Sequence, residues 1–140
     1  MSAPLTFHYD VLGGDFTSAG NASVKAKKAL RQLGFDPDTI RRVSIAMYEG
    51  EINMVIHANG GSADIVVYDD AIEIVLADKG PGIPDVNLAM QEGYSTAPDN
   101  IRSLGFGAGM GLPNMKRHTD DIKIETTLGV GTTITMRVNV

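Results

Sequence analysis

The chain has 140 residues with 43% hydrophobic side chains, which is enough for one hydrophobic core, so we expect a single domain over residues 1–140. The formal net charge of -5 disfavours nucleic acid as a partner, and the absence of cysteine excludes a disulfide scaffold and a thiolate metal site. No apolar stretch approaches the ~18 residues that span a bilayer, which predicts a cytoplasmic protein without a membrane segment.

The first half of the chain predicts a strand followed by two helices. Apolar and polar residues roughly alternate over residues 5–11, as in a strand with one buried face. Apolar residues then recur at helical spacing over 18–33. Asp36 and Pro37 provide the N-cap and first turn expected of a second, long helix that runs to about residue 58.

A hairpin and a glycine-rich loop follow. Residues 63–68 and 71–77 are rich in Ile and Val and are joined by Asp69-Asp70, which predicts two well-buried strands. Residues 79–111 then hold seven glycines. A compact domain seldom keeps such a segment unless it is a binding loop or a lid.

The last part of the chain predicts a third helix over about 110–119 and two strands, over 122–126 and 132–138. Strands in runs beside grouped helices favour an α/β sandwich. We therefore expect a mixed, mostly antiparallel sheet that is covered on one face by helices.

The second predicted helix carries two polar residues on one face. Glu49 and Asn53 are four residues apart, so their side chains share a helix face. A solvated surface is the common explanation of such a short pattern, but the helix is rich in core-type residues, which favours a polar stripe lining a cleft. Gly50 in the middle of this helix costs about 1 kcal/mol relative to alanine, a cost often offset by a packing or functional need.

Two further motifs are rich in glycine. Asp78 ends a buried strand and is followed by Gly80 and Gly82, which suits either a simple turn or an adenine pocket in which the carboxylate accepts a hydrogen bond from the exocyclic amino group. The segment 105–111 alternates glycine with other residues and leads into the third helix, as a phosphate-binding loop would. The spacing matches neither the Rossmann fingerprint nor the Walker A motif.

These motifs stand in the same order as in a known family. With Glu49-x-x-x-Asn53, Asp78-x-Gly80-x-Gly82, the loop 105–111 and Gly131-Thr132, the chain resembles the ATP-binding domains of DNA gyrase, Hsp90, histidine kinases and the mismatch-repair ATPases. That resemblance implies the Bergerat-type fold, with ATP held between the helices and a lid at about 85–107.

Within that family, the chain looks most like the small anti-sigma-factor serine/threonine kinases, especially their switch-kinase branch. Four stretches carry this likeness, namely residues 49–58, 78–85, 89–96 and 109–113. One departure is Gly50-Glu51, where such kinases usually carry small or apolar residues.

The resemblance assigns roles by position. Glu49 is implied as the general base toward a serine or threonine hydroxyl, and Asn53 as the ligand of the Mg²⁺ that accompanies ATP. Asp78 is implied to read adenine. The remaining nucleotide-binding residues implied are Gly80, Gly82, Gly105, Gly107, Gly109, Gly111, Leu112 and Thr132.

The function implied is a protein kinase that phosphorylates a small anti-sigma-antagonist (STAS-like) protein in a partner-switching pathway. A sigma factor and a PP2C-type phosphatase are further partners implied by the resemblance, and a homodimer is compatible with it. The alternative is a nucleotide-gated binding module that captures a sigma factor or a phosphatase without essential phosphoryl transfer. Retention of Glu49 favours the kinase.

Overall fold

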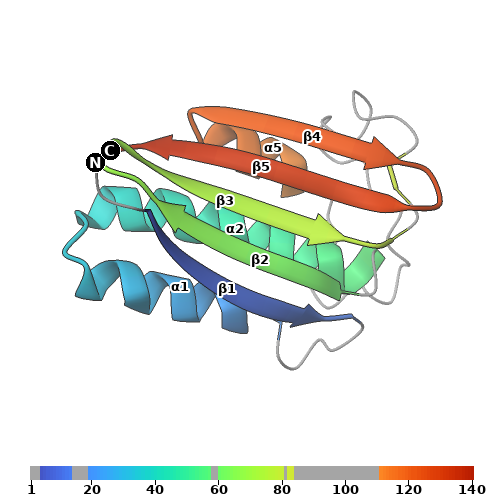
Figure 1. Cartoon of the computed structure of the whole chain (residues 1–140), viewed down its shortest axis with the longest axis horizontal. Helices are drawn as coiled ribbons and strands as arrows, with labels where there is room; N and C mark the ends of the chain where they lie inside the picture. The colour runs from blue at the N-terminus through green and yellow to red at the C-terminus, as the bar shows by residue number, and fades with distance from the viewer. Residues whose placement is uncertain (1–3, 14–18, 58–59, 81, 84–110) are drawn as a thin grey trace.

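The computed structural model describes residues 4–13, 19–57, 60–80, 82–83 and 111–140. Within these residues, the chain forms five strands and three helices (Figure 1). They are β1 (Leu5–Leu12), α1 (Asn21–Gln32), α2 (Pro37–His57), β2 (Gly60–Val67), β3 (Ala71–Asp78), α5 (Gly111–Arg117), β4 (Asp121–Thr127) and β5 (Gly131–Asn139). None of the described helices is long and apolar enough to cross a membrane.

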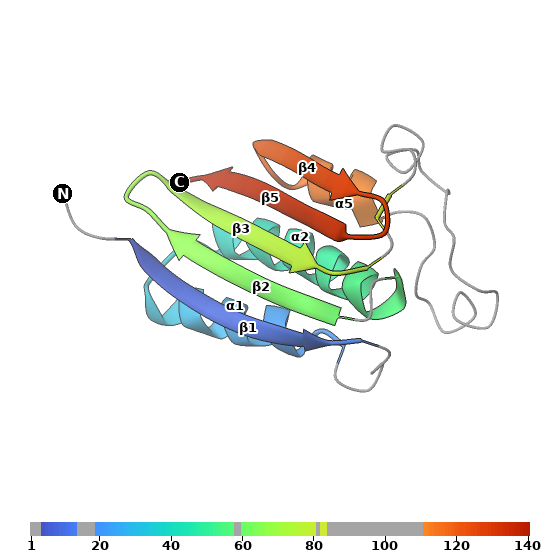
Figure 2. The same ribbon diagram turned by 45° about the vertical axis from the view of Figure 1, so that its right-hand side comes forward.

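The strands form one sheet in the order β1-β2-β3-β5-β4, and all four pairings between them are antiparallel. Helices α1, α2 and α5 lie together behind this sheet, and α2 lies between the other two (Figures 1 and 2). The predicted α/β sandwich with helices on one face is confirmed. Because β3 pairs with β5, the C-terminal end of β3 lies beside the start of β5.

The core lies between the sheet and the helices. Alternate residues of the central strands point toward the helices, since successive side chains of a strand face opposite sides. Ile74 on β3, for example, is fully buried between its register partners Ile65 on β2 and Met136 on β5. Val43 and Met47 of α2 are likewise fully buried and contribute to the same cluster. Helix α2 is therefore a central core element with its position fixed on several sides.

The two long helices, α1 and α2, differ in how the N–H groups of their first turns are capped. At α2, the predicted cap is confirmed, because Asp36 accepts hydrogen bonds from the Asp38 N–H at 2.9 Å and from the Thr39 hydroxyl at 2.7 Å. Helix α1 begins at Asn21, later than predicted, after Gly20 with φ of 96°. Gly20 provides no side chain to cap α1, so the first turn takes its acceptors from another element.

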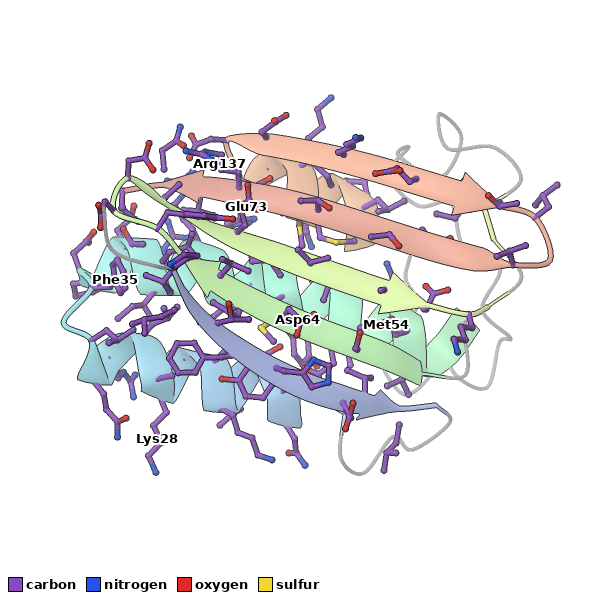
Figure 3. The ribbon with its side chains drawn as sticks, viewed as in Figure 1. Lys28, Phe35, Met54, Asp64, Glu73 and Arg137 are labelled. Carbon is purple, nitrogen blue, oxygen red and sulfur yellow. The ribbon has the colours of Figure 1, made fainter. Side chains whose placement is uncertain are left out.

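The face of the sheet that points away from the helices is polar. Glu73 and Arg137 are register partners on β3 and β5, with Arg137 Nη1 3.6 Å from Glu73 Oε1. Asp64 on β2 accepts a hydrogen bond from His8 of β1. Figure 3 labels Glu73, Arg137 and Asp64 on this face and Lys28 on α1, at the opposite layer. The sheet thus buries one face and exposes the other.

Candidate functional site

The two polar residues predicted on α2 both face α5. Glu49 and Asn53 are one helical turn apart and half-buried. The Nδ2 group of Asn114, on α5, donates a hydrogen bond to Oε1 of Glu49 at 3.1 Å. The Asn53 amide lies against the first residue of α5, Gly111. Glu49 and Asn53 therefore share one face of α2, and this face points to α5, the helix that begins at Gly111.

Gly111 permits the close approach of α5 to Asn53. A Cβ atom added at Gly111 would lie 2.9 Å from Nδ2 and 3.1 Å from Oδ1 of Asn53, which is closer than ordinary contact. Within the described residues, the Asn53 amide makes no hydrogen bond. Its oxygen is thus an available ligand atom at the start of α5.

The surroundings of Gly50 account for a glycine in the middle of α2, where it lowers the stability of the helix. A Cβ atom added there would lie 1.9 Å from Cδ1 of Leu76 on β3 and 3.4 Å from Sδ of Met115 on α5. The absence of a side chain therefore lets α2 pack directly on β3 and α5. Of the two explanations that the sequence left open, a packing or a functional need, the contacts of Gly50 support packing.

Glu51, the other half of the sequence departure, points to α1. Only 2% of the residue is exposed. Its Oε2 accepts hydrogen bonds from the N–H groups of Gly20 at 2.9 Å and Ala22 at 3.2 Å. Its Oε1 accepts from the N–H of Ser23 at 3.0 Å and from the Ser23 hydroxyl at 2.7 Å. A carboxylate at this position suits both the unpaired N–H groups and the positive end of a helix. Glu51 therefore caps α1 and leaves the face of Glu49 and Asn53 unaltered.

Asp78, the last residue of β3, is held by backbone groups. Its Oδ1 accepts hydrogen bonds from the N–H of Gly80 at 2.9 Å and from the N–H of Thr132 at 3.1 Å. Gly131 is needed for this approach of β5, because its Cβ would lie 2.1 Å from the carbonyl oxygen of Asp78. Oδ2 accepts no hydrogen bond from the described residues. One carboxylate oxygen is therefore fixed and the other is available to a ligand.

A pair of threonines ties the loop after β3 to the β4–β5 hairpin. Thr126 Oγ1 lies 2.9 Å from Thr132 Oγ1 and accepts a hydrogen bond from the Ile83 N–H at 2.8 Å. Gly82 has φ of 84°, and a Cβ there would lie 2.8 Å from the Thr127 carbonyl oxygen. Gly82 thus packs closely against the backbone at the end of β4, and a side chain at this position would clash there.

The structure brings most of the described site residues into two groups. Asp78, Gly80 and Thr132 are joined by hydrogen bonds at the ends of β3 and β5, whereas Glu49, Asn53 and Gly111 meet between α2 and α5. Leu112 differs, because its side chain is buried in the hydrophobic core. The proposed lid at 85–107 lies outside the described residues. So do three glycines predicted to bind the nucleotide, namely Gly105, Gly107 and Gly109.

Three residues of these networks were missed by the sequence reasoning. Thr126 carries no signal of its own, and Asn114 belongs to no motif. Glu51 did carry a signal, because it is a charged residue in a helix made largely of core-type residues. A charged residue is almost never fully buried without a partner, so its position indicated that a polar partner lies nearby. Nothing in the sequence, however, identifies those partners, which are 28 to 31 residues away.

The polar groups fit a nucleotide whose metal ion has few protein ligands. The described residues contain no group of three or more His, Cys, Asp or Glu that could hold a metal ion. Mg²⁺ at phosphates usually keeps several waters and takes only one or two protein ligands. The unpaired amide oxygen of Asn53 therefore fits Mg²⁺ bound through a nucleotide, and does not indicate a metal site built by protein alone.

The structure thus combines a layered α/β fold with an aspartate at the end of β3 and a Glu–Asn pair facing α5. In a comparison with known families, the model of the histidine kinase-like ATPase domain matches residues 15–138. The chain belongs to that family.

Individual proteins similar to this chain show which members of the family it resembles. The chain is 32% identical over 123 residues to an anti-sigma F factor of Priestia megaterium, covering 83% of this chain and 80% of the relative. It is 31% identical over 112 residues to the serine/threonine-protein kinase RsbT of Bacillus subtilis (strain 168), covering 77% and 78%. The solved structure of the mycobacterial sensor histidine kinase MprB has the same fold, with a TM-score of 0.55 and 17% identity over 96% of this chain and 97% of that one.

Proposed function

We propose that this chain is an ATP-dependent serine/threonine protein kinase of the anti-sigma-factor type. Membership of the ATPase family and the names of the relatives, an anti-sigma F factor and a serine/threonine-protein kinase, support this proposal. The observation that carries it is the Glu49–Asn53 pair on one face of α2, beside the first turn of α5. A potential base and a potential metal ligand thus lie one helical turn apart.

The adenine of ATP binds at Asp78 in this proposal. Because Oδ1 of Asp78 is held by the N–H groups of Gly80 and Thr132, Oδ2 is oriented to accept a hydrogen bond from the exocyclic amino group of adenine. Such a charge-assisted bond is stronger than a neutral one. Gly82, together with Gly105, Gly107 and Gly109 of the loop, belongs to the proposed nucleotide contacts, as does the backbone of Leu112.

The phosphates lie toward α2 and α5. Asn53 holds Mg²⁺ through its amide oxygen, and the bound ion neutralises charge on the phosphates. Glu49 accepts the proton of a serine or threonine hydroxyl as the hydroxyl oxygen attacks the γ-phosphorus and ADP leaves. Phosphoryl transfer depends mainly on positioning and charge stabilisation, so one base, one metal ion and a loop of N–H donors are sufficient.

The protein substrate in this proposal is a small anti-sigma-antagonist (STAS-like) protein. A sigma factor and a PP2C-type phosphatase are the other partners of such a pathway. The names of the anti-sigma F factor relatives support a partner-switching role. A homodimer is compatible with the proposal, and neither nucleic acid nor a membrane is required.

The test compares Glu49→Ala with the wild type in two measurements. Calorimetry gives the affinity for ATP and Mg²⁺, and labelled ATP gives phosphate incorporation into candidate antagonist proteins encoded near the gene. We expect nearly unchanged nucleotide affinity and a loss of about 10² to 10⁴ in phosphorylation rate, which is the typical contribution of a general base. Glu125→Ala is the matched control, because Glu125 is exposed on β4 and, among the described residues, forms an ion pair only with Lys123.

Three outcomes would contradict the proposal or a part of it. An undiminished rate in Glu49→Ala would show that Glu49 is not the base. If neither protein phosphorylated any candidate, while a partner bound in proportion to nucleotide occupancy, the chain would be a nucleotide-gated binding module. Equal ATP affinity with and without Mg²⁺ would argue against Asn53 as a metal ligand.

A further inference from the structure

Asn114 of α5 connects the proposed base to a cation. Its Nδ2 group donates a hydrogen bond to Oε1 of Glu49 at 3.1 Å, across the contact between α5 and α2. Its Oδ1 accepts a hydrogen bond from Nη1 of Arg117, three residues further along α5, at 3.3 Å. Arg117, Asn114 and Glu49 therefore form a chain of hydrogen bonds that ends on the proposed base.

The chemistry of Arg117 fixes the direction of this chain. An asparagine amide has one accepting and one donating end, and the two ends have nearly the same shape. A guanidinium group only donates, so the oxygen of Asn114 must face Arg117. The NH₂ group of Asn114 is then directed at Glu49, where a carboxylate oxygen accepts. Arg117 thus selects the amide orientation in which Asn114 supports Glu49.

Asn114 is also held at its backbone. Its carbonyl oxygen accepts hydrogen bonds from the N–H of His118 at 3.2 Å and from Nδ1 of His118 at 2.8 Å. The same helix begins at Gly111, which lies against Asn53. Helix α5 therefore contacts both proposed active-site residues of α2, Asn53 through Gly111 and Glu49 through Asn114.

We propose that Asn114 is a positioning residue for Glu49. By holding Oε1, it restrains rotation of the carboxyl group and leaves Oε2 to accept the proton of the substrate hydroxyl. The inference rests on the proposed function, because it assumes that Glu49 is the base. Asn114 itself touches neither nucleotide nor substrate in this proposal.

The decisive variant is Asn114→Asp. Aspartate keeps the size of asparagine and accepts a hydrogen bond from Arg117 at least as well, but it cannot donate to Glu49. We expect kcat for phosphorylation to fall about tenfold or more, equivalent to about 1.4 kcal/mol of transition-state stabilisation. The KM for ATP and the KM for the protein substrate should each change less than about twofold, since the lost interaction acts in the chemical step.

Two further variants separate positioning from a merely structural role. Asn114→Ala removes both hydrogen bonds and should lower kcat to a similar extent. Lys116→Ala is the matched control, because Lys116 is exposed on the same short helix, and it should behave as the wild type. Circular dichroism and the midpoint of thermal unfolding report whether each variant is folded at the assay temperature.

A double-mutant cycle completes the test. In a Glu49→Ala background, Asn114→Asp should cause no additional loss of kcat in single-turnover assays, because a positioning residue has no effect without the group it positions. An equal loss in both backgrounds would overturn the inference. The inference would also be overturned if Asn114→Asp kept the kcat of the wild type while Glu49→Ala lost most of its kcat. Full activity of Glu49→Ala alone would instead refute the proposed function.

Discussion

Glu51→Ala removes the acceptor of four hydrogen bonds at the start of α1. The bonds come from the N–H groups of Gly20, Ala22 and Ser23 and from the Ser23 hydroxyl. A hydrogen bond to a charged group contributes about 1.5 to 3 kcal/mol, but four bonds to one carboxylate are not additive, and water can reach part of the truncated site. We expect the free energy of unfolding to fall by about 3 kcal/mol, a large fraction of the ~5 to 15 kcal/mol typical of a domain.

Urea unfolding followed by circular dichroism measures this effect. Asp38→Ala is the matched control, because Asp38 is an exposed carboxylate in the first turn of α2 that forms an ion pair with Arg41. Such exposed pairs contribute at most about 1 kcal/mol. Glu51→Gln tests the charge separately and should also destabilise, since its NH₂ group would face an N–H donor. A loss below about 1 kcal/mol in Glu51→Ala, no greater than in the control, would refute the capping role.

Three other substitutions test packing, nucleotide recognition and pH dependence. Gly50→Ala places a Cβ atom 1.9 Å from Cδ1 of Leu76, so urea unfolding should show a net loss of about 1 to 3 kcal/mol, and a more stable variant would contradict the packing argument. Asp78→Asn should weaken ATP binding about 10- to 150-fold in calorimetry, whereas equal affinity of the wild type for ATP and GTP would argue against adenine recognition. The backbone N–H of Asn139 is the main cause that lowers the pKa of Asp120 from 3.8. The Asp120 carboxylate therefore stabilises the fold above pH 3.8, and this contribution is lost as the pH falls through the lowered pKa. The difference in free energy of unfolding between the wild type and Asp120→Asn should accordingly shrink in acid titrations.

The architecture could be predicted because it depends on local patterns. Alternation of apolar residues indicated β1, and runs rich in Ile and Val indicated β2 and β3. The strands β4 and β5 were expected as well, and the Asp36-Pro37 cap identified the start of α2. The order of elements favoured helices on one face. The motif residues Glu49, Asn53 and Asp78 then allowed the family to be recognised, which the match to the histidine kinase-like ATPase domain confirmed. Their catalytic and binding roles stay predictions.

The interactions that support the site could not be predicted, because they join residues far apart in the chain. Asn114 and Glu49 are 65 residues apart, and the partners of Glu51 lie on a helix whose own sequence shows no cap. The start of α1 was misplaced for the same reason, since its first turn is defined by Glu51 rather than by a nearby side chain. Hydrophobic periodicity locates a helix, but it does not indicate which distant polar group its ends require.

Three successive residues of α2 face three different neighbours. Glu49 bonds to α5, Gly50 packs on β3, and Glu51 bonds to α1, as steps of about 100° per residue around a helix allow. A rotation or one-residue slip of α2 would break all three contacts at once. These three contacts therefore fix the place of Glu49 relative to the sheet. In the proposed mechanism, an incoming protein target must then bring its hydroxyl group to Glu49, so the accuracy of phosphorylation depends on how that target docks.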